Sequence, residues 1–361
     1  MTIQNDEEVV TIRAGAQALA HLRREGLCAE QVAVIPGAAG GPKAIGLVGL
    51  DQAVFPWLEA APRQREFIGA SIGAWRLACA LQTDAPARLA RLAEHYTDTT
   101  YPSAKVSDIT RQTRDMLDTL LSDDDLHRAL NHPHHRLSLL VVASRGALNQ
   151  DRRGPLLAGL ALAAASNLLA RSLLRYSFTR VVCHDANSSL CYLPDDDLPT
   201  RLTVLNDANV RDLLMATAAI PGVIEGIRSD TLPGTLLRDG GLADYHLDLP
   251  FAAAPGLALF PHFTDRIVPG WFDKFLPWRH ADAARQANTI VIAPSRRYLA
   301  SLPQGKLPDR GDFKRFAGQD AERQRLWRRA AAESQRLGDA FLALCDSGRI
   351  AQVARPLFDD Q

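Results

Sequence analysis

The sequence predicts an α/β fold with a mainly parallel sheet covered by helices on both faces. Short, continuously apolar runs alternate along the 361 residues with longer helical patterns. Strands that are apolar on both faces are typical of parallel sheets lying between helices. Hydrophobic residues make up 47% of the chain, enough for a large core, and the formal net charge of zero argues against a nucleic-acid-binding protein. We therefore expect a single α/β domain over residues 1–361.

The elements follow one another along the chain with few long connections. Strands are predicted by the apolar runs at 32–36, 65–69, 138–144, 179–185, 202–206, 235–241, 256–260 and 288–294. Helices are predicted by apolar residues at helical spacing over 12–26, 42–55, 72–82, 156–175, 210–220 and 320–346. Residues 83–136 are mostly polar and helical in pattern, and we expect them to form an insertion.

The composition also predicts the cellular compartment of the protein. Its first ten residues are acidic and polar, unlike a secretory signal or a transit peptide. Five scattered cysteines indicate reduced thiols and not a disulfide framework. The apolar run at 156–170 is too short to span a bilayer, so it predicts a buried or half-buried helix. We expect a cytoplasmic protein; the sequence leaves its oligomeric state open.

One serine lies between two glycines where a predicted strand becomes a predicted helix. The stretch reads Gly69-Ala-Ser71-Ile-Gly73. In a nucleophile elbow the serine occupies a sharp strand-to-helix turn, and its neighbours two positions away must be small because the turn brings them together. The helix N-terminus favours negative charge developing near the serine. Ser71 is therefore a candidate nucleophile; the alternative is a glycine-rich turn that only connects two elements.

A glycine-rich loop upstream could stabilise an oxyanion. The loop at 36–46 follows a predicted strand, and its glycines allow close approach to backbone N–H groups. Since proline has no N–H, we expect Gly40 and Gly41 to be the donors, with the Lys43 N–H as a third. A phosphate-binding loop is the alternative, but the Walker A and G-x-G-x-x-G patterns are both absent.

A carboxylate downstream could act as the base. Asp239 ends an apolar strand and is followed by Gly240 and Gly241. Polar groups of α/β sites collect where strands end. An ordinary Asp-Gly turn is the alternative.

In this order, these stretches resemble the patatin-like phospholipase family. That family combines a glycine-rich loop carrying a basic residue, a G-x-S-x-G elbow and an Asp-Gly-Gly or Asp-Gly-Ala turn. A fourth similarity is ATAAIPGV at Ala216–Val223, shortly before the aspartate. The resemblance covers roughly residues 30–250 and implies a three-layer α/β/α fold. Within it, 83–136 would be a helical insertion and 251–361 a C-terminal extension.

The resemblance implies a serine acyl hydrolase with a Ser71–Asp239 dyad. Its substrates would be carboxylic esters of lipids, such as phospholipids, lysophospholipids or glycerides, with no cofactor and no metal. The sequence departs from the family pattern in three places. Lys43 stands where arginine is usual, Trp75 stands where small residues are usual, and no Asn-x-Pro follows the aspartate.

Other interpretations remain open. The fold could be catalytically silent and bind a lipid or a partner protein. A Ser–Asp–His triad could use His246, His262 or His280, although none lies in a recognisable signature. The HPHH run at 132–135 could bind metal, but no cysteine or carboxylate at ligand spacing accompanies it, which favours a solvated loop.

The segment 260–278 is rich in aromatic residues. It contains six of the chain's 23 aromatic side chains, with basic residues among them. Aromatic and basic side chains together suit the boundary between water and lipid. We hypothesise a lid or peripheral membrane contact there; the alternative is ordinary core packing.

Overall fold

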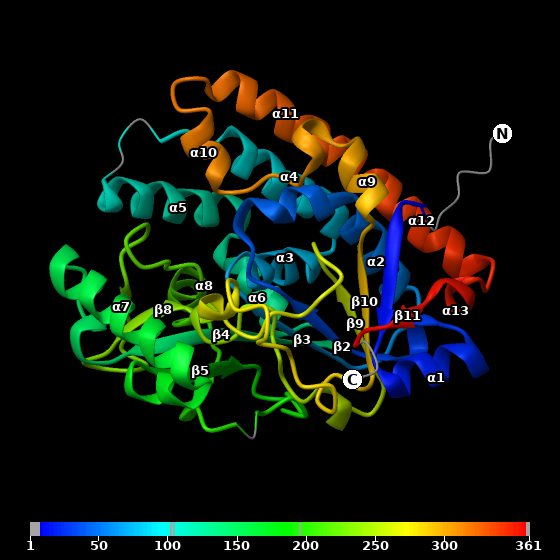
Figure 1. The fold of residues 1–361 in the computed structure, drawn as a ribbon, viewed down its shortest axis with the longest axis horizontal. Coiled ribbons are helices and arrows are strands. Elements are labelled where there is room, and N and C mark those ends of the chain that lie inside the picture. Colours follow the sequence, from blue (N-terminus) through cyan, green and yellow to red (C-terminus); the bar gives the residue numbers. More distant parts are fainter. Residues whose placement is uncertain (1–7, 102, 104, 195, 359–361) are drawn as a thin grey trace.

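The computed structural model describes residues 8–101, 103, 105–194 and 196–358. A single sheet runs through the molecule, with helices against both faces (Figure 1). Its strands are β1 (Val10–Ala14), β2 (Val32–Gly37), β3 (Arg65–Ala70), β4 (His135–Ser144), β5 (Phe178–His184), β6 (Thr200–Val204), β7 (Ile227–Arg228), β8 (Leu236–Asp239), β9 (Leu257–Pro261), β10 (Thr289–Pro294) and β11 (Arg355–Pro356). The α-helices are α1 (Ala16–Glu25), α2 (Val48–Glu59), α3 (Ile72–Ala80), α4 (Ala85–Asp98), α5 (Val106–Leu120), α6 (Asp123–Leu130), α7 (Arg153–Leu169), α8 (Val210–Thr217), α9 (Arg296–Ser301), α10 (Gly311–Arg315), α11 (Asp320–Glu333), α12 (Gln335–Asp346) and α13 (Ile350–Val353).

The main sheet has the strand order β11-β1-β10-β9-β2-β3-β4-β5-β6, and β8 joins it through β4. Among the described residues, six of the ten strand pairings are parallel. β2, β3, β9 and β10 are buried along their whole length. The predicted fold class, a mainly parallel sheet between helices, is confirmed.

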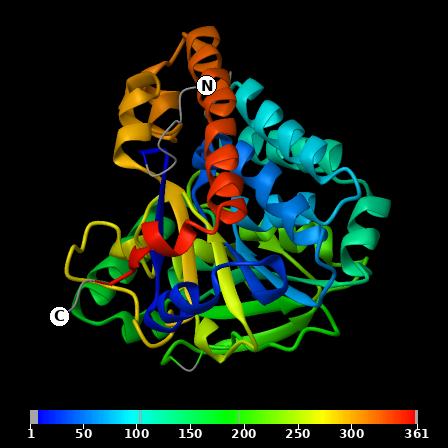
Figure 2. The same cartoon turned by 90° about the vertical axis from the view of Figure 1, so that its right-hand side faces the viewer.

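Alternation along β4 shows how the layers are filled. Val141 and Ala143 belong to the large core cluster, which also includes residues of α2, α3, α4 and α12. Val142 belongs to a smaller cluster with Leu156 and Ala163 of α7. Because successive side chains of a strand point to opposite faces, α7 lies on the other face of the sheet. The helices α2, α3, α4 and α12, which contribute to the large core cluster, lie above strands β2, β3 and β4 in Figure 1, and Figure 2 shows the molecule from its right-hand side.

The structure corrects two sequence predictions of secondary structure. Residues 12–14 belong to strand β1 and not to the first helix, because Val10–Ala14 pairs antiparallel with β10 and leaves α1 to begin at Ala16. The predicted helix over 320–346 is two helices, α11 and α12, which meet at Ser334. The predicted insertion over 83–136 contains α4, α5 and α6, as its pattern indicates.

The described residues after 250 contribute strands to the sheet and are not an appendage to it. β9 and β10 lie between β1 and β2, so the C-terminal third of the chain supplies interior strands. The boundary near residue 250, where the sequence resemblance ends, is therefore not a boundary in the fold. Within the part of the chain that the structure describes, no helix is both long and apolar enough to cross a bilayer.

Candidate active site

Two strands meet end to end on one edge of β4. β3 runs parallel to β4, and its last residue pair with β4 is Ala70–Leu140. β8 runs antiparallel and ends at the pair Asp239–Val141. Since Leu140 and Val141 are consecutive and β5 occupies the other edge of β4, the C-terminal ends of β3 and β8 face each other. This register brings Ser71 and Asp239 together.

The backbone at Ser71 has the strained turn that the sequence predicts. Its φ of 55° and ψ of −133° place a non-glycine residue in the left-handed half of conformational space, at the junction of β3 and α3. A Cβ on Gly73 would lie 2.0 Å from the Gly37 carbonyl oxygen, and one on Gly69 would lie 2.6 Å from the Ala74 nitrogen. Both positions therefore require glycine, as the sequence predicts. The clash at Gly73 is with the backbone at the end of β2 and not with a side chain at position 69.

Ser71 and Asp239 are joined by a direct hydrogen bond. The Ser71 hydroxyl donates to Asp239 Oδ2 at 2.8 Å, and the Gly241 N–H donates to Oδ1 at 2.8 Å. Both side chains are buried. Burial raises the pKa of Asp239, while the nearby charge of Arg310 and the two hydrogen bonds oppose that rise. A Cβ on Gly240 would lie 2.1 Å from the Leu140 carbonyl oxygen, so this turn also requires glycine.

The stretch at Ala216–Val223 supports both members of the pair. Thr217 Oγ1 accepts a hydrogen bond from the Ser71 N–H at 2.8 Å and donates to the Leu140 carbonyl at 2.6 Å. The Ala219 carbonyl accepts from the Asp239 N–H at 3.1 Å. Thr217 is completely buried. The sequence singled out this stretch without indicating that Thr217 positions the elbow.

The glycine-rich loop lies beside the pair. Gly40 and Lys43 line a cavity together with Ser71 and Asp239, and Gly41 lines a second cavity that also reaches Ser71. Gly41 has a φ of 58° and begins a 3₁₀-helix, Gly41–Leu47, that leads into α2. The Lys43 ammonium lies 4.3 Å from the ring centre of Phe263. Burial lowers the pKa of Lys43.

Two cavities therefore open on Ser71. The larger has a volume of about 580 Å³, and the smaller about 250 Å³. The larger contains charged groups, among them Lys274 and Arg310. The smaller is lined largely by apolar and aromatic side chains: Ile72, Trp75, Tyr96, Tyr101, Ile109, Met116, Ala218, Ile220, Val223, Ile224 and Phe313. An apolar chamber and a chamber that combines apolar side chains with several charged groups share one serine, which suits an amphiphilic ester.

The basic residues of the site come partly from the C-terminal third of the chain. Arg310 lines both cavities, and a Cβ on Gly41 would lie 3.1 Å from its Nε. Burial lowers the pKa of Lys274 to about 7, and its ammonium lies 3.8 Å from the Tyr245 ring centre. Sequence reasoning did not find Arg310, because no motif surrounds it and only the tertiary fold brings it to Ser71.

The histidines considered for a triad lie elsewhere. Among the described residues, neither cavity that reaches Ser71 is lined by a histidine. His246 Nδ1 accepts from the Val268 N–H at 3.0 Å, and His262 Nδ1 donates to the Thr264 carbonyl at 2.6 Å. His280 is exposed and lines a different cavity. The partner of the serine hydroxyl is the Asp239 carboxylate itself.

The aromatic segment 260–278 divides into two parts. Phe260 and Phe263 are buried, as the core interpretation expects. Trp271, Phe275 and Trp278 are exposed, and the first two line the larger cavity. The core interpretation holds for Phe260 and Phe263, and a lid or membrane contact at the exposed residues stays a prediction.

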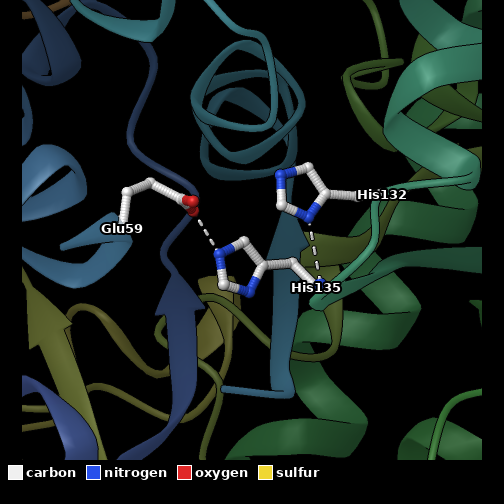
Figure 3. A group of neighbouring side chains, drawn as sticks. All are labelled: Glu59, His132 and His135. Atoms are coloured by element: carbon white, nitrogen blue, oxygen red, sulfur yellow. Dashed lines mark hydrogen bonds and ion pairs between the residues drawn. The ribbon is translucent and has the colours of Figure 1, made fainter. Parts of the chain in front are cut away.

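One histidine cluster has metal-like composition. Glu59, His132 and His135 place potential ligand atoms within 4.8 Å of one another (Figure 3). The sequence expectation of a solvated loop without a carboxylate is wrong here, since His135 is buried at the start of β4 and hydrogen-bonded to Glu59. His132 Nδ1 accepts from the N–H groups of His134 and His135, so its proton sits on Nε2. A metal ligand needs a lone pair at that atom, so this network does not favour an ion.

Comparison with protein-family models gives no match, and comparison with curated proteins gives none either.

Proposed function

We propose that this protein is a serine acyl hydrolase that cleaves carboxylic ester bonds of lipids. The observation that carries the proposal is the hydrogen bond between the Ser71 hydroxyl and Asp239 Oδ2 at a strained strand-to-helix turn. Such a turn is costly and persists where the surrounding structure holds it, often at functional sites. The resemblance of the sequence motifs to patatin-like phospholipases supports the same conclusion.

The chemistry requires only groups of this chain. Asp239 takes the hydroxyl proton while Ser71 Oγ attacks the ester carbonyl carbon. In our proposal the N–H groups of Gly40 and Gly41 stabilise the resulting oxyanion, with Lys43 adding positive charge. The tetrahedral intermediate collapses, the protonated Asp239 passes its proton to the leaving alcohol, and an acyl-serine remains. Water then attacks the acyl-serine, giving its proton to Asp239, and Ser71 recovers its proton as the carboxylic acid leaves.

The two cavities suggest how a lipid ester would lie. The apolar chamber beside Trp75 would hold the acyl chain, and the chamber with Lys274 and Arg310 would hold the polar part. Trp75 therefore has a place in the wall of the acyl chamber, where its indole N–H donates to the Leu214 carbonyl at 2.8 Å. We propose a cytoplasmic enzyme that meets lipid at membrane surfaces.

A fluorophosphonate probe tests the proposal directly. It should label the wild-type protein on Ser71, leave Ser71→Ala unlabelled, and label Asp239→Asn much more slowly because the base is gone. Peptide mapping identifies the labelled residue. A folded wild-type protein that is neither labelled nor active on p-nitrophenyl esters would contradict the hydrolase proposal and favour a silent, lipid-binding protein.

A further inference from the structure

Exposed large hydrophobic side chains are concentrated in two segments. Eight of the ten such residues in the described chain lie within residues 153–176 and 271–278. They are Leu157, Leu162, Leu168, Leu169, Tyr176, Trp271, Phe275 and Trp278. Scattered apolar residues on a surface are ordinary, but this degree of clustering indicates an interaction site.

Helix α7 is apolar on both its faces. Its inner stripe of Leu156, Gly159, Ala163 and Asn167 is buried. The opposite face carries leucine and alanine, with Leu162 and Leu169 exposed by 66% and 80%. After Arg153 the helix contains no charged residue. A helix at the edge of a protein in water normally has a polar outer face, so the outer face of α7 is unusual.

The two segments are tied to each other. Asn167 Nδ2 of α7 donates to Asp273 Oδ1 at 2.7 Å, and Arg171 forms an ion pair with Asp273 at 3.1 Å. Arg279 donates to the Asn167 carbonyl at 2.9 Å. These contacts hold Phe275 and Trp278 beside α7, which lies at the left margin of the molecule in Figure 1. We call the exposed side chains of Leu157, Leu162, Leu168, Leu169, Phe275 and Trp278 the α7 surface.

The α7 surface borders the entrance to the catalytic cavity. Leu160 of α7 lines the 580 Å³ cavity together with Trp271 and Phe275, and Ser71 lies in the same cavity. A molecule held against the α7 surface would therefore be next to the path that leads to the nucleophile.

Arginines flank this surface along the chain. Residues 152–184 include five arginines and no acidic residue. Arg180 is buried in ion pairs, and Arg171 and Arg175 are paired with Asp273 and Asp197. Arg152 and Arg153 are exposed at the start of α7, and Arg171 and Arg175 follow its end. Leucine and aromatic side chains flanked by arginine are the composition of surfaces that sit in the headgroup region of anionic membranes.

We propose that the α7 surface docks this protein onto anionic lipid bilayers and presents the cavity entrance to the membrane. The partner is a lipid surface, because the patch combines exposed leucine and aromatic side chains with flanking arginines. The role in catalysis rests on the proposed hydrolase function, but membrane binding itself needs no chemistry. The membrane-binding proposal and the hydrolase proposal can therefore be contradicted independently of each other.

The test is flotation of the purified protein with anionic vesicles that contain phosphatidylglycerol and with neutral vesicles of phosphatidylcholine alone. Every protein tested carries Ser71→Ala, so that no lipid is consumed. The double variant Leu162→Gln, Leu169→Gln should lose tenfold or more of its binding to the anionic vesicles, since two leucine side chains no longer enter the interface. The matched control is Leu202→Gln, Val204→Gln, which alters two exposed residues of β6 and should bind as before. Binding to the neutral vesicles should be weaker and little affected by salt.

Two companion measurements complete the test. With Ser71 restored, the α7 variant should keep its melting temperature and its activity on soluble esters but lose activity on anionic vesicles. Equal vesicle binding by both double variants would overturn the proposal. So would a wild-type dimer that the α7 variant alone converts to a monomer, because the surface would then be an interface between copies. Loss of soluble esterase activity in Ser71→Ala, by contrast, tests only the hydrolase function.

Discussion

Polar clusters lie at both ends of the adjacent strands β3 and β4, and they differ in backbone strain and in access to a cavity. At the C-terminal end of β3, Ser71 is strained, bonded to a carboxylate and open to two cavities. At the other end, where Arg65 pairs with His135, the exposed Glu59 is bonded to the buried His135, and His132 accepts backbone hydrogen bonds. Chemical composition alone would make the histidine cluster the more obvious site. Strain and an accessible cavity distinguish the serine.

The largest expected effect comes from the Ser71–Asp239 pair. Ser71→Ala and Asp239→Asn should each lower kcat/KM on p-nitrophenyl esters by about 10³ or more, and the double variant should be no worse, because the two groups act as a unit. Steady-state kinetics and thermal melting measure this. The control is Ser144→Ala, which changes a different buried serine at the end of β4 and should retain activity. Substantial activity in a folded Ser71→Ala protein would contradict the assignment.

Thr217 tests whether the elbow must be held in place. Thr217→Val leaves the Ser71 N–H and the Leu140 carbonyl without their partner, which should lower the free energy of unfolding by about 1–3 kcal/mol. Since the nucleophile is then less well placed, kcat should fall by roughly tenfold with little change in KM. Thr217→Ser keeps the hydroxyl and should restore both properties. A valine variant with unchanged kcat would show that the hydrogen bond has no positioning role.

Arg310 should set the pH dependence of the reaction. Asp239 is a base only when ionised, so kcat/KM should fall as the pH drops through its pKa. Burial raises that pKa and the charge of Arg310 lowers it. Arg310→Met removes the lowering effect and should move the acid limb to higher pH. Arg315→Met, at the end of the short helix α10 that follows Arg310 and outside both cavities, should leave the profile in place. An acid limb that does not move, or moves to lower pH, would contradict this electrostatic role.

The smallest effect is expected at the histidine end. Glu59→Gln weakens the bond to His135 and should lower the unfolding free energy by about 1 kcal/mol, while kcat/KM stays the same. The pKa of Glu59 is lowered, chiefly by that bond, so its contribution to stability exists above the unfolded value of 4.5 and disappears as the pH falls further. Melting curves at pH 7 and pH 3 should therefore differ between wild type and variant only at pH 7. A loss of activity at unchanged stability would make this cluster functional.

Local patterns allowed the sequence to predict most of the sheet and the elbow. The pattern of Gly69, Ser71 and Gly73 is visible within five residues, although the clash that requires Gly73 is with distant Gly37. The apolar runs of β2, β3 and β4 are long enough to be recognised directly. The features that the sequence missed depend on distant parts of the chain. β1 is a strand because β10 pairs with it. Arg310 reaches the site, and Glu59 reaches His135, only through the tertiary fold.

The order of the strands has a consequence for synthesis of the chain. β2 is apolar on both faces, and its second neighbour, β9, begins at Leu257, more than half of the chain later. Until β9 emerges from the ribosome, one edge of β2 exposes unpaired backbone groups, which is a template for aggregation. The Ser71–Asp239 contact likewise closes a loop of 168 residues. The nascent protein therefore lacks the Ser71–Asp239 pair until β8 has been synthesised and has paired with β4.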